Sequence, residues 1–163
     1  MKVVFLYIFV LIGFQSFGQK TLDDVLKKHN RSDIPYISVQ ELAMSKTKAK
    51  ILDARSFEEY KVSHLKDAVF VDFKNFNLKK TTQLFPNKNE IIVVYCSIGV
   101  RSAKIAQQLK DEGYTNVFNL YGGIFEWKNN NFSVFDLNEK ATEKVHVYDK
   151  NWSKWLIKGE KVF

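Results

Sequence analysis

The chain has 163 residues, of which 45% are hydrophobic and 26% charged, with seven glycines and two prolines. This composition is typical of one packed globular domain and excludes a long disordered chain. The formal net charge is +7, and the lysines are scattered along the chain instead of forming a block. We therefore expect a solvated, lysine-rich surface and no nucleic-acid partner.

The N-terminal residues are typical of an export signal. Lys2 precedes the apolar run 3–14, and the small residues Ser16 and Gly18 follow it with the spacing of a cleavage site. That run is shorter than the roughly 20 residues that a membrane-spanning helix needs. We predict a signal peptide at residues 1–18, export to the periplasm or full secretion, and no stable membrane insertion after its removal. A retained membrane anchor is the alternative.

After this segment, the apolar pattern predicts helices and strands in alternation. In chain order we expect a helical segment within 19–33, a strand at 36–39 with a short helix after it, a strand ending at Asp53, a helical turn at 57–62, strands at 67–73 and 89–96, a helix ending before Gly113, a strand at 116–123 and a helical turn at 124–130. Such alternation predicts an α/β domain built on a mainly parallel central sheet flanked by helices.

The last segment, residues 131–163, has a less regular pattern. It contains Trp152, Trp155 and several other apolar residues. We expect this C-terminal extension to pack on the domain, and a protein partner for it is left open.

Cys96 is the only cysteine of the chain and follows the apolar run Ile91–Tyr95. A β-branched run that is apolar on both faces suits the buried middle of a parallel sheet. Ligands collect beyond the carboxyl ends of such strands. A single thiol cannot form an internal disulfide, and the commoner fate of a lone cysteine is burial as a small hydrophobic residue. The residues around Cys96 therefore decide its role.

A short turn connects this strand to a helix that we expect to begin near Arg101 or Ser102. The residues of the turn are Ser97, Ile98, Gly99 and Val100. Gly99 permits a positive φ angle, so backbone N–H groups can converge on one point. Converging amides and a helix N-terminus stabilise a thiolate and lower the pKa of Cys96. Arg101 adds a permanent cation suited to an oxyanion. The pattern predicts a nucleophilic cysteine facing an anionic substrate.

Three blocks of the sequence resemble the single-domain rhodanese (thiosulfate sulfurtransferase) family. They are LDARSFEEYKVSHLKDA, VVYCSIGVRSAKIAQQL and GYTNVFNLYGGIFEWK, in the order of the family. The resemblance covers residues 34–130 and implies a three-layer α/β domain. The chain departs from the family at Ser63 and Asp67, where glycine is usual.

The resemblance also implies roles for individual residues. Cys96 would accept a sulfane sulfur and hold it as a persulfide. Its substrate-binding residues would be Ser97, Ile98, Gly99, Val100 and Arg101, through their backbone amides and through the Arg101 side chain. Ser102, Asp53 and Arg55 would support the loop. For Asp53 and Arg55 the alternative is a surface ion pair of little energetic weight.

Further matched residues are expected to be structural. Glu59, Tyr60 and His64 match the family's helix and following turn, and we expect His64 to pack there instead of taking part in catalysis. Gly122, Gly123 and Trp127 match the family's final turn and core aromatic residue, and all these residues stand in the quoted blocks.

The sequence thus predicts a sulfurtransferase that moves sulfur from a small sulfur-containing anion to a thiophilic acceptor, with neither metal nor organic cofactor. The alternative is a binding or docking module without activity. A phosphatase is disfavoured, because the resemblance implies that phosphatases of this fold have a loop one residue longer than the six residues from Cys96 to Arg101. A thiol–disulfide oxidoreductase is disfavoured because no second cysteine is present to resolve a mixed disulfide.

Overall fold

The computed structural model describes residues 21–29, 33–44 and 46–163. The signal peptide predicted at residues 1–18 lies outside the described residues. Among the described residues, no helix has the length and apolar character needed to cross a membrane.

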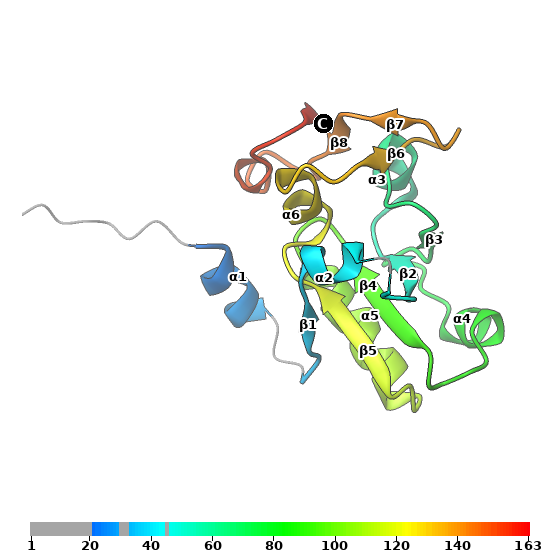
Figure 1. The fold of residues 1–163 in the computed structure, drawn as a ribbon. Coiled ribbons are helices and arrows are strands. Elements are labelled where there is room, and N and C mark those ends of the chain that lie inside the picture. The colour runs from blue at the N-terminus through cyan, green and yellow to red at the C-terminus, as the bar shows by residue number, and fades with distance from the viewer. Residues whose placement is uncertain (1–20, 30–32, 45) are drawn as a thin grey trace, which may run out of the picture.

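Five parallel strands form the central sheet, in the order β1-β5-β4-β2-β3 (Figure 1). The strands are β1 (Tyr36–Ile37), β2 (Lys50–Asp53), β3 (Val69–Phe70), β4 (Ile91–Tyr95) and β5 (Asn116–Leu120). The helices are α1 (Leu22–His29), α2 (Val39–Ala43), α3 (Phe57–Val62), α4 (Leu78–Leu84), α5 (Val100–Asp111) and α6 (Gly123–Asn129).

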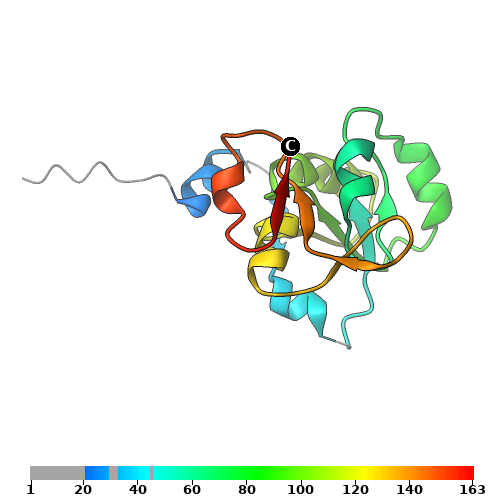
Figure 2. The same ribbon diagram turned by 90° about the horizontal axis from the view of Figure 1, so that it is seen from above.

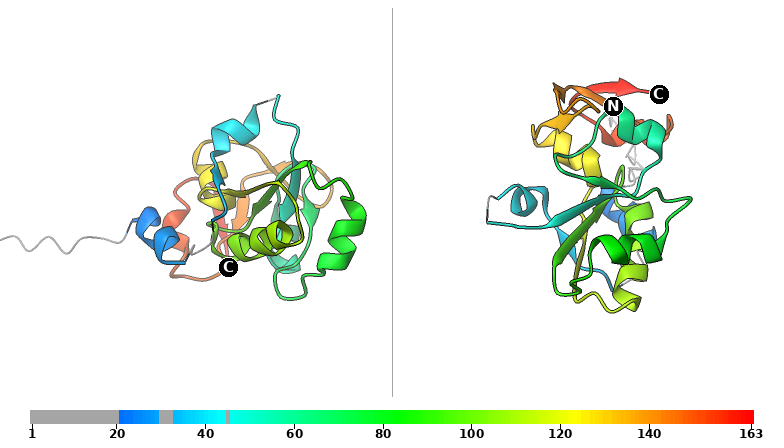
Figure 3. Two further views of the ribbon diagram at one scale, coloured as in Figure 1. Left: turned by 90° about the horizontal axis from the view of Figure 1, so that it is seen from below. Right: turned by 90° about the vertical axis from the view of Figure 1, so that its right-hand side faces the viewer.

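Strand β4 lies in the middle of the sheet and is buried on both faces, because successive side chains of a strand point to opposite sides. Ile92 and Val94 pack in one core cluster with Ile105 of α5. Val93 and Tyr95 pack in the other cluster, which α2 and α6 cover. Figure 3 shows α2 and α5 on opposite sides of the strands. The predicted three-layer α/β fold with a parallel central sheet is confirmed.

Several boundaries differ from those predicted. The strand expected at 36–39 ends at Ile37, because the Ser38 side chain accepts a hydrogen bond from the Glu41 N–H and caps α2. The strand expected at 67–73 is reduced to the edge strand β3. Helix α5 begins at Val100, one or two residues before the start expected near Arg101 or Ser102.

The C-terminal extension forms four short strands and a 3₁₀ helix. These are β6 (Val134–Phe135), β7 (Ala141–Thr142), β8 (Lys144–His146), η1 (Ser153–Trp155) and β9 (Glu160–Val162). Val145, Val147 and Leu156 are buried in the same core cluster as Ile98, which belongs to the loop after β4. Figures 1 and 2 show β8 and the red C-terminal strand at the end of the molecule where α3 and α6 lie. The extension therefore lies next to that loop.

Candidate active site

Cys96 directly follows β4 and is almost completely buried, with 1% of its surface exposed. The Gly99 N–H donates a hydrogen bond to Sγ at 3.1 Å, and the Ser102 hydroxyl lies 3.5 Å from Sγ. Gly99 has a φ of 114° and is the N-cap of α5. A side chain at this position would be strained, so glycine permits the turn that directs its N–H toward the sulfur.

The pKa of Cys96 lies below its ordinary value. Burial alone would raise this pKa, but the positive charge of Arg101 and hydrogen bonds from Ser102 and Gly99 outweigh it. The thiolate is the nucleophilic form of cysteine. The site is therefore suited to attack by sulfur on an electrophilic atom without a neighbouring base.

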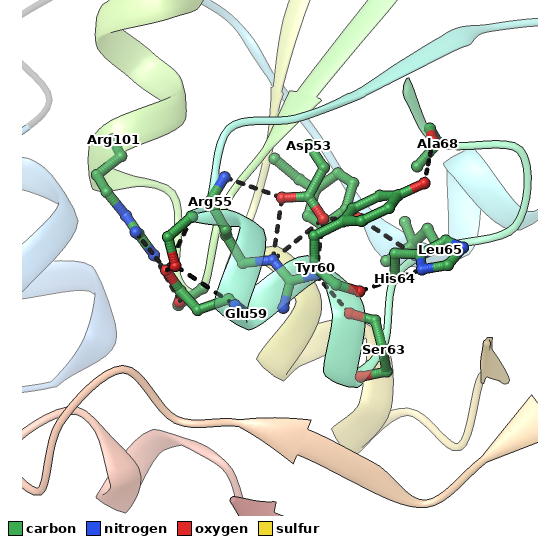
Figure 4. Close-up of polar contacts among 12 residues, drawn as sticks. Asp53, Arg55, Glu59, Tyr60, Ser63, His64, Leu65, Ala68 and Arg101 are labelled. Atoms are coloured by element: carbon green, nitrogen blue, oxygen red, sulfur yellow. Dashed lines mark hydrogen bonds and ion pairs between the residues drawn. The ribbon is translucent and has the colours of Figure 1, made fainter. Parts of the chain in front are cut away.

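Glu59 fixes the position of Arg101, a role that no pattern in the sequence predicted for it. The two terminal nitrogens of Arg101 donate to the two Glu59 carboxylate oxygens, each at 2.7 Å, and one of them also donates to Ser97 Oγ at 2.9 Å (Figure 4). Ser56 and Glu59 form a capping box at the start of α3, which orients the carboxylate. The Ser56-x-x-Glu59 pattern was the one visible signal of this arrangement.

Burial would raise the pKa of Glu59, but the hydrogen bonds and charge of Arg101, together with the charge of Arg55, lower it to about 2. Glu59 is therefore ionised at neutral pH and compensates the charge of Arg101. Arg101 is thus held as one member of a bidentate ion pair, instead of facing the solvent as a free cation.

Asp53 and Arg55 form a completely buried ion pair, so the alternative of a surface ion pair is wrong. Arg55 Nη2 lies 2.6 Å from Asp53 Oδ2, and both side chains have no exposed surface. The same nitrogen donates to the Ser63 carbonyl oxygen at 2.6 Å. The Tyr95 hydroxyl donates to Asp53, and the Leu65 N–H donates to that hydroxyl at 3.1 Å. Through Tyr95 the pair thus joins the end of β2 to the end of β4, the strand that directly precedes Cys96.

Helix α6 supports the loop from behind. The Ile124 N–H donates to the Cys96 carbonyl at 3.0 Å, and the Phe125 N–H donates to the Ser97 carbonyl at 3.2 Å. A Cβ atom on Gly123 would lie 2.2 Å from the Cys96 carbonyl oxygen. Glycine is therefore the residue that allows α6 to approach the loop this closely.

Asn119 is a second supporting residue that sequence reasoning missed. It is completely buried on β5, its Nδ2 donates to the Gly99 carbonyl at 2.8 Å, and its Oδ1 accepts from the Ser102 hydroxyl at 2.7 Å. Nothing local to Asn119 in the sequence pointed to this role.

The turn after α3 is held by packing and by backbone hydrogen bonds. The ring of His64 stacks on Tyr60 with 4.2 Å between centroids, and the His64 backbone pairs with Phe135. Figure 4 shows these rings beside the Asp53–Arg55 pair. Asp67 has a φ of 59°, the left-handed conformation that glycine adopts most easily. Aspartate tolerates this conformation, which explains how the turn forms without the family's glycine.

A cavity of about 160 Å³ opens beside Cys96. Its lining residues are Cys96, Ser97, Ile98, Val100, Arg101, Tyr148 and Trp152. Gly99 and Ser102, which were also predicted to form the site, contact the sulfur without lining the cavity. Asp53 and Arg55 do not line it either, and Asp53 accepts a hydrogen bond from Tyr95. Tyr148 and Trp152 come from the C-terminal extension, and the guanidinium of Arg101 lies 4.7 Å from the centre of the Tyr148 ring.

The family profile described as "Rhodanese-like domain" matches residues 38–130, which include α2 to α6 and the whole Cys96 loop. The chain belongs to the rhodanese-like domain family. The Cys96 cavity of this rhodanese-like protein is therefore lined partly by the family's loop and partly by residues beyond the matched range.

Known proteins share this rhodanese-like part. The "tRNA uridine(34) hydroxylase" of Aster yellows witches'-broom phytoplasma (strain AYWB) is 37% identical over 99 residues, covering 56% of this chain and 32% of that protein. The "Putative sulfur carrier protein YrkF" of Bacillus subtilis (strain 168) is 32% identical over 101 residues, covering 60% of this chain and 53% of that protein. The chain spans about a third of the length of the curated relatives it matches first.

A solved structure shows the same fold. The crystal structure of thiosulfate sulfurtransferase from Pseudomonas aeruginosa aligns with a TM-score of 0.57 and 24% sequence identity, covering 63% of this chain and 20% of that chain. The likeness supports the rhodanese-like architecture of the parallel sheet and its flanking helices.

The lowered pKa of Cys96 is testable by alkylation. We expect the rate of reaction with iodoacetamide to rise with pH and to reach half its plateau below the ordinary pKa of a cysteine thiol. Arg101→Met removes the cation that lowers this pKa, so the midpoint should move to higher pH, and Arg101→Lys should move it less. Identical midpoints in the unaltered protein and in Arg101→Met would contradict the electrostatic role of Arg101.

Proposed function

We propose that this rhodanese-like protein is a sulfurtransferase. It takes a sulfane sulfur from thiosulfate or a related small anion, holds it on Cys96 as a persulfide, and passes it to a thiophilic acceptor such as cyanide or a thiol. We propose that it acts after export, in the periplasm, as the pattern of residues 1–18 predicts.

The observation that carries the proposal is a cysteine of lowered pKa in a six-residue loop, Cys96 to Arg101, at the wall of a small cavity. In the first step the thiolate attacks the outer sulfur of thiosulfate. A Cys96 S–S bond forms, the S–S bond of thiosulfate breaks, and sulfite leaves with the electron pair. In the second step the acceptor attacks the terminal sulfur, and the Cys96 thiolate is the leaving group.

The backbone around Cys96 supports this chemistry. The Gly99 N–H points at Sγ, and α5 directs its N-terminus toward the same region. Partial positive charge at a helix N-terminus stabilises an anion. The persulfide, like the thiolate before it, carries a negative charge, which the N-terminus of α5 favours.

The names of the relatives differ in how directly they indicate sulfur chemistry. One is named a putative sulfur carrier protein, which accords with a sulfur bound to Cys96. Others are named tRNA uridine(34) hydroxylase, and their shared stretch covers about a third of their length. That shared stretch is the rhodanese-like part, so the proposal for this chain rests on what the part itself can do.

The test is the intact mass of the protein after incubation with thiosulfate, with Cys96→Ser beside it. We expect a gain of one sulfur atom in the unaltered protein, no gain in the variant, and removal of the added sulfur by cyanide. No gain from thiosulfate or from glutathione persulfide, with Cys96 reduced and reactive toward iodoacetamide, would contradict the proposal. Hydroxylation of tRNA or steady phosphate release from an aryl phosphate would then indicate the function instead.

A further inference from the structure

Part of the wall of the Cys96 cavity is aromatic and comes from the C-terminal extension. Tyr148 and Trp152 line the cavity together with Ile98 and Val100 of the loop. Both aromatic residues lie beyond the range 38–130 that the family profile matches. This part of the wall is therefore a feature of this chain's extension.

The positive charge at the cavity belongs to an ion pair. Among the described residues, Arg101 is the one lysine or arginine that lines the cavity, and its two terminal nitrogens donate to the Glu59 carboxylate, each at 2.7 Å. The Tyr148 ring packs on the Arg101 guanidinium, with 4.7 Å between the guanidinium carbon and the ring centroid. Beside this paired cation, an apolar group of a donor meets Ile98, Val100 and two aromatic side chains.

The aromatic wall is held by a defined turn of the extension. Tyr148 has a φ of 66°, a conformation that is strained for a residue other than glycine and persists where the surroundings impose it. His146 Nδ1 accepts from the Tyr148 N–H at 3.0 Å, and the Asp149 carboxylate accepts from the Trp152 N–H at 3.2 Å. The preceding Val147 is completely buried. These backbone hydrogen bonds and the buried Val147 thus hold the segment that places the two rings at the cavity.

We propose that Tyr148 and Trp152 determine donor specificity and select sulfur donors that carry an apolar, preferably aromatic, group. This proposal rests on the sulfurtransferase function above. The chemical class is a thiosulfonate, R–SO₂–S⁻, which carries one negative charge. The Cys96 thiolate attacks its terminal sulfur, a Cys96 S–S bond forms, the S–S bond of the donor breaks, and the sulfinate R–SO₂⁻ leaves with the electron pair. The R group lies against the two rings.

The test compares two donors of equal charge and equal reacting bond, benzenethiosulfonate and methanethiosulfonate. The rate of Cys96 persulfide formation is measured by intact mass for each donor, and the ratio of the two rates removes the reactivity of the thiol itself. We expect the ratio to fall about tenfold in Tyr148→Ala, equivalent to about 1.4 kcal/mol, which lies in the upper part of the range for one aromatic contact. Tyr148→Phe should keep the ratio of the unaltered protein.

Phe163→Ala is the matched control, because Phe163 is an exposed aromatic residue of the same extension and does not line the cavity. It should leave the ratio unchanged, and a thermal melt of each variant shows that the fold is retained. Persulfide from both donors with the same ratio in Tyr148→Ala as in the unaltered protein would overturn this proposal alone. Absence of persulfide from every donor, thiosulfate included, would overturn the sulfurtransferase function and this proposal with it.

Discussion

Arg55→Met should destabilise the protein by about 3–5 kcal/mol, the usual effect of removing one partner of a buried ion pair. The Asp53 carboxylate has no exposed surface, and the substitution removes the cation that pairs with it. It also removes the hydrogen bond from Arg55 to the Ser63 carbonyl. Methionine is of comparable length and keeps much of the packing, so the loss reports mainly on the charge and its hydrogen bonds. Urea unfolding followed by circular dichroism measures it.

Lys61→Met is the control for this experiment. Lys61 pairs with Glu58 on the surface of α3, and 44% of the Lys61 side chain is exposed. Exposed ion pairs contribute below about 1 kcal/mol, so this variant should unfold close to the unaltered protein. Similar free energies of unfolding for the two variants would show that Asp53 and Arg55 do not stabilise the fold in the way described.

The fold and the active loop follow from patterns that are local in the sequence. The run Ile91–Tyr95 is apolar on both faces, and it forms the central strand. Ser56 and Glu59 mark the start of the helix at 57–62, and its observed bounds are those predicted. Gly99 was expected to adopt a positive φ, and it does. Each of these features depends on a few consecutive residues, so no tertiary contact was needed to find them.

The parts that were missed depend on distant residues or lack a periodic pattern. Glu59 and Arg101 are 42 residues apart in the sequence, and Asn119 is 20 residues from Gly99, the loop residue that it contacts. Helix α4 at 78–84 was not predicted because it buries Thr81 while Leu84 is exposed, which leaves no apolar stripe. The position of the extension at the cavity is likewise set by tertiary packing.

Gly123→Ala should have a second large effect, on both stability and the active loop. Its φ of 56° disfavours any residue with a Cβ atom, and that atom would lie 2.2 Å from the Cys96 carbonyl oxygen. Backbone must shift to relieve such a contact, which weakens the hydrogen bonds from Ile124 and Phe125 to the loop. We expect a destabilisation of about 4 kcal/mol, in the range of the most severe single substitutions.

Gly113→Ala separates the close approach from the strain of a positive φ. Gly113 has a φ of 96°, but a Cβ atom there would meet only the flexible end of Lys88 at 3.6 Å. This variant should lose about 1–2 kcal/mol of folding stability and keep the rate of persulfide formation on Cys96.

In Gly123→Ala that rate should fall even under conditions where the protein remains folded, because the carbonyl of Cys96 itself must move. Equal stability and equal rates in the two variants would show that the contact between α6 and the loop does not shape the site. If only Gly123→Ala loses persulfide formation, then α6 holds the Cys96 sulfur in position through the backbone of Cys96.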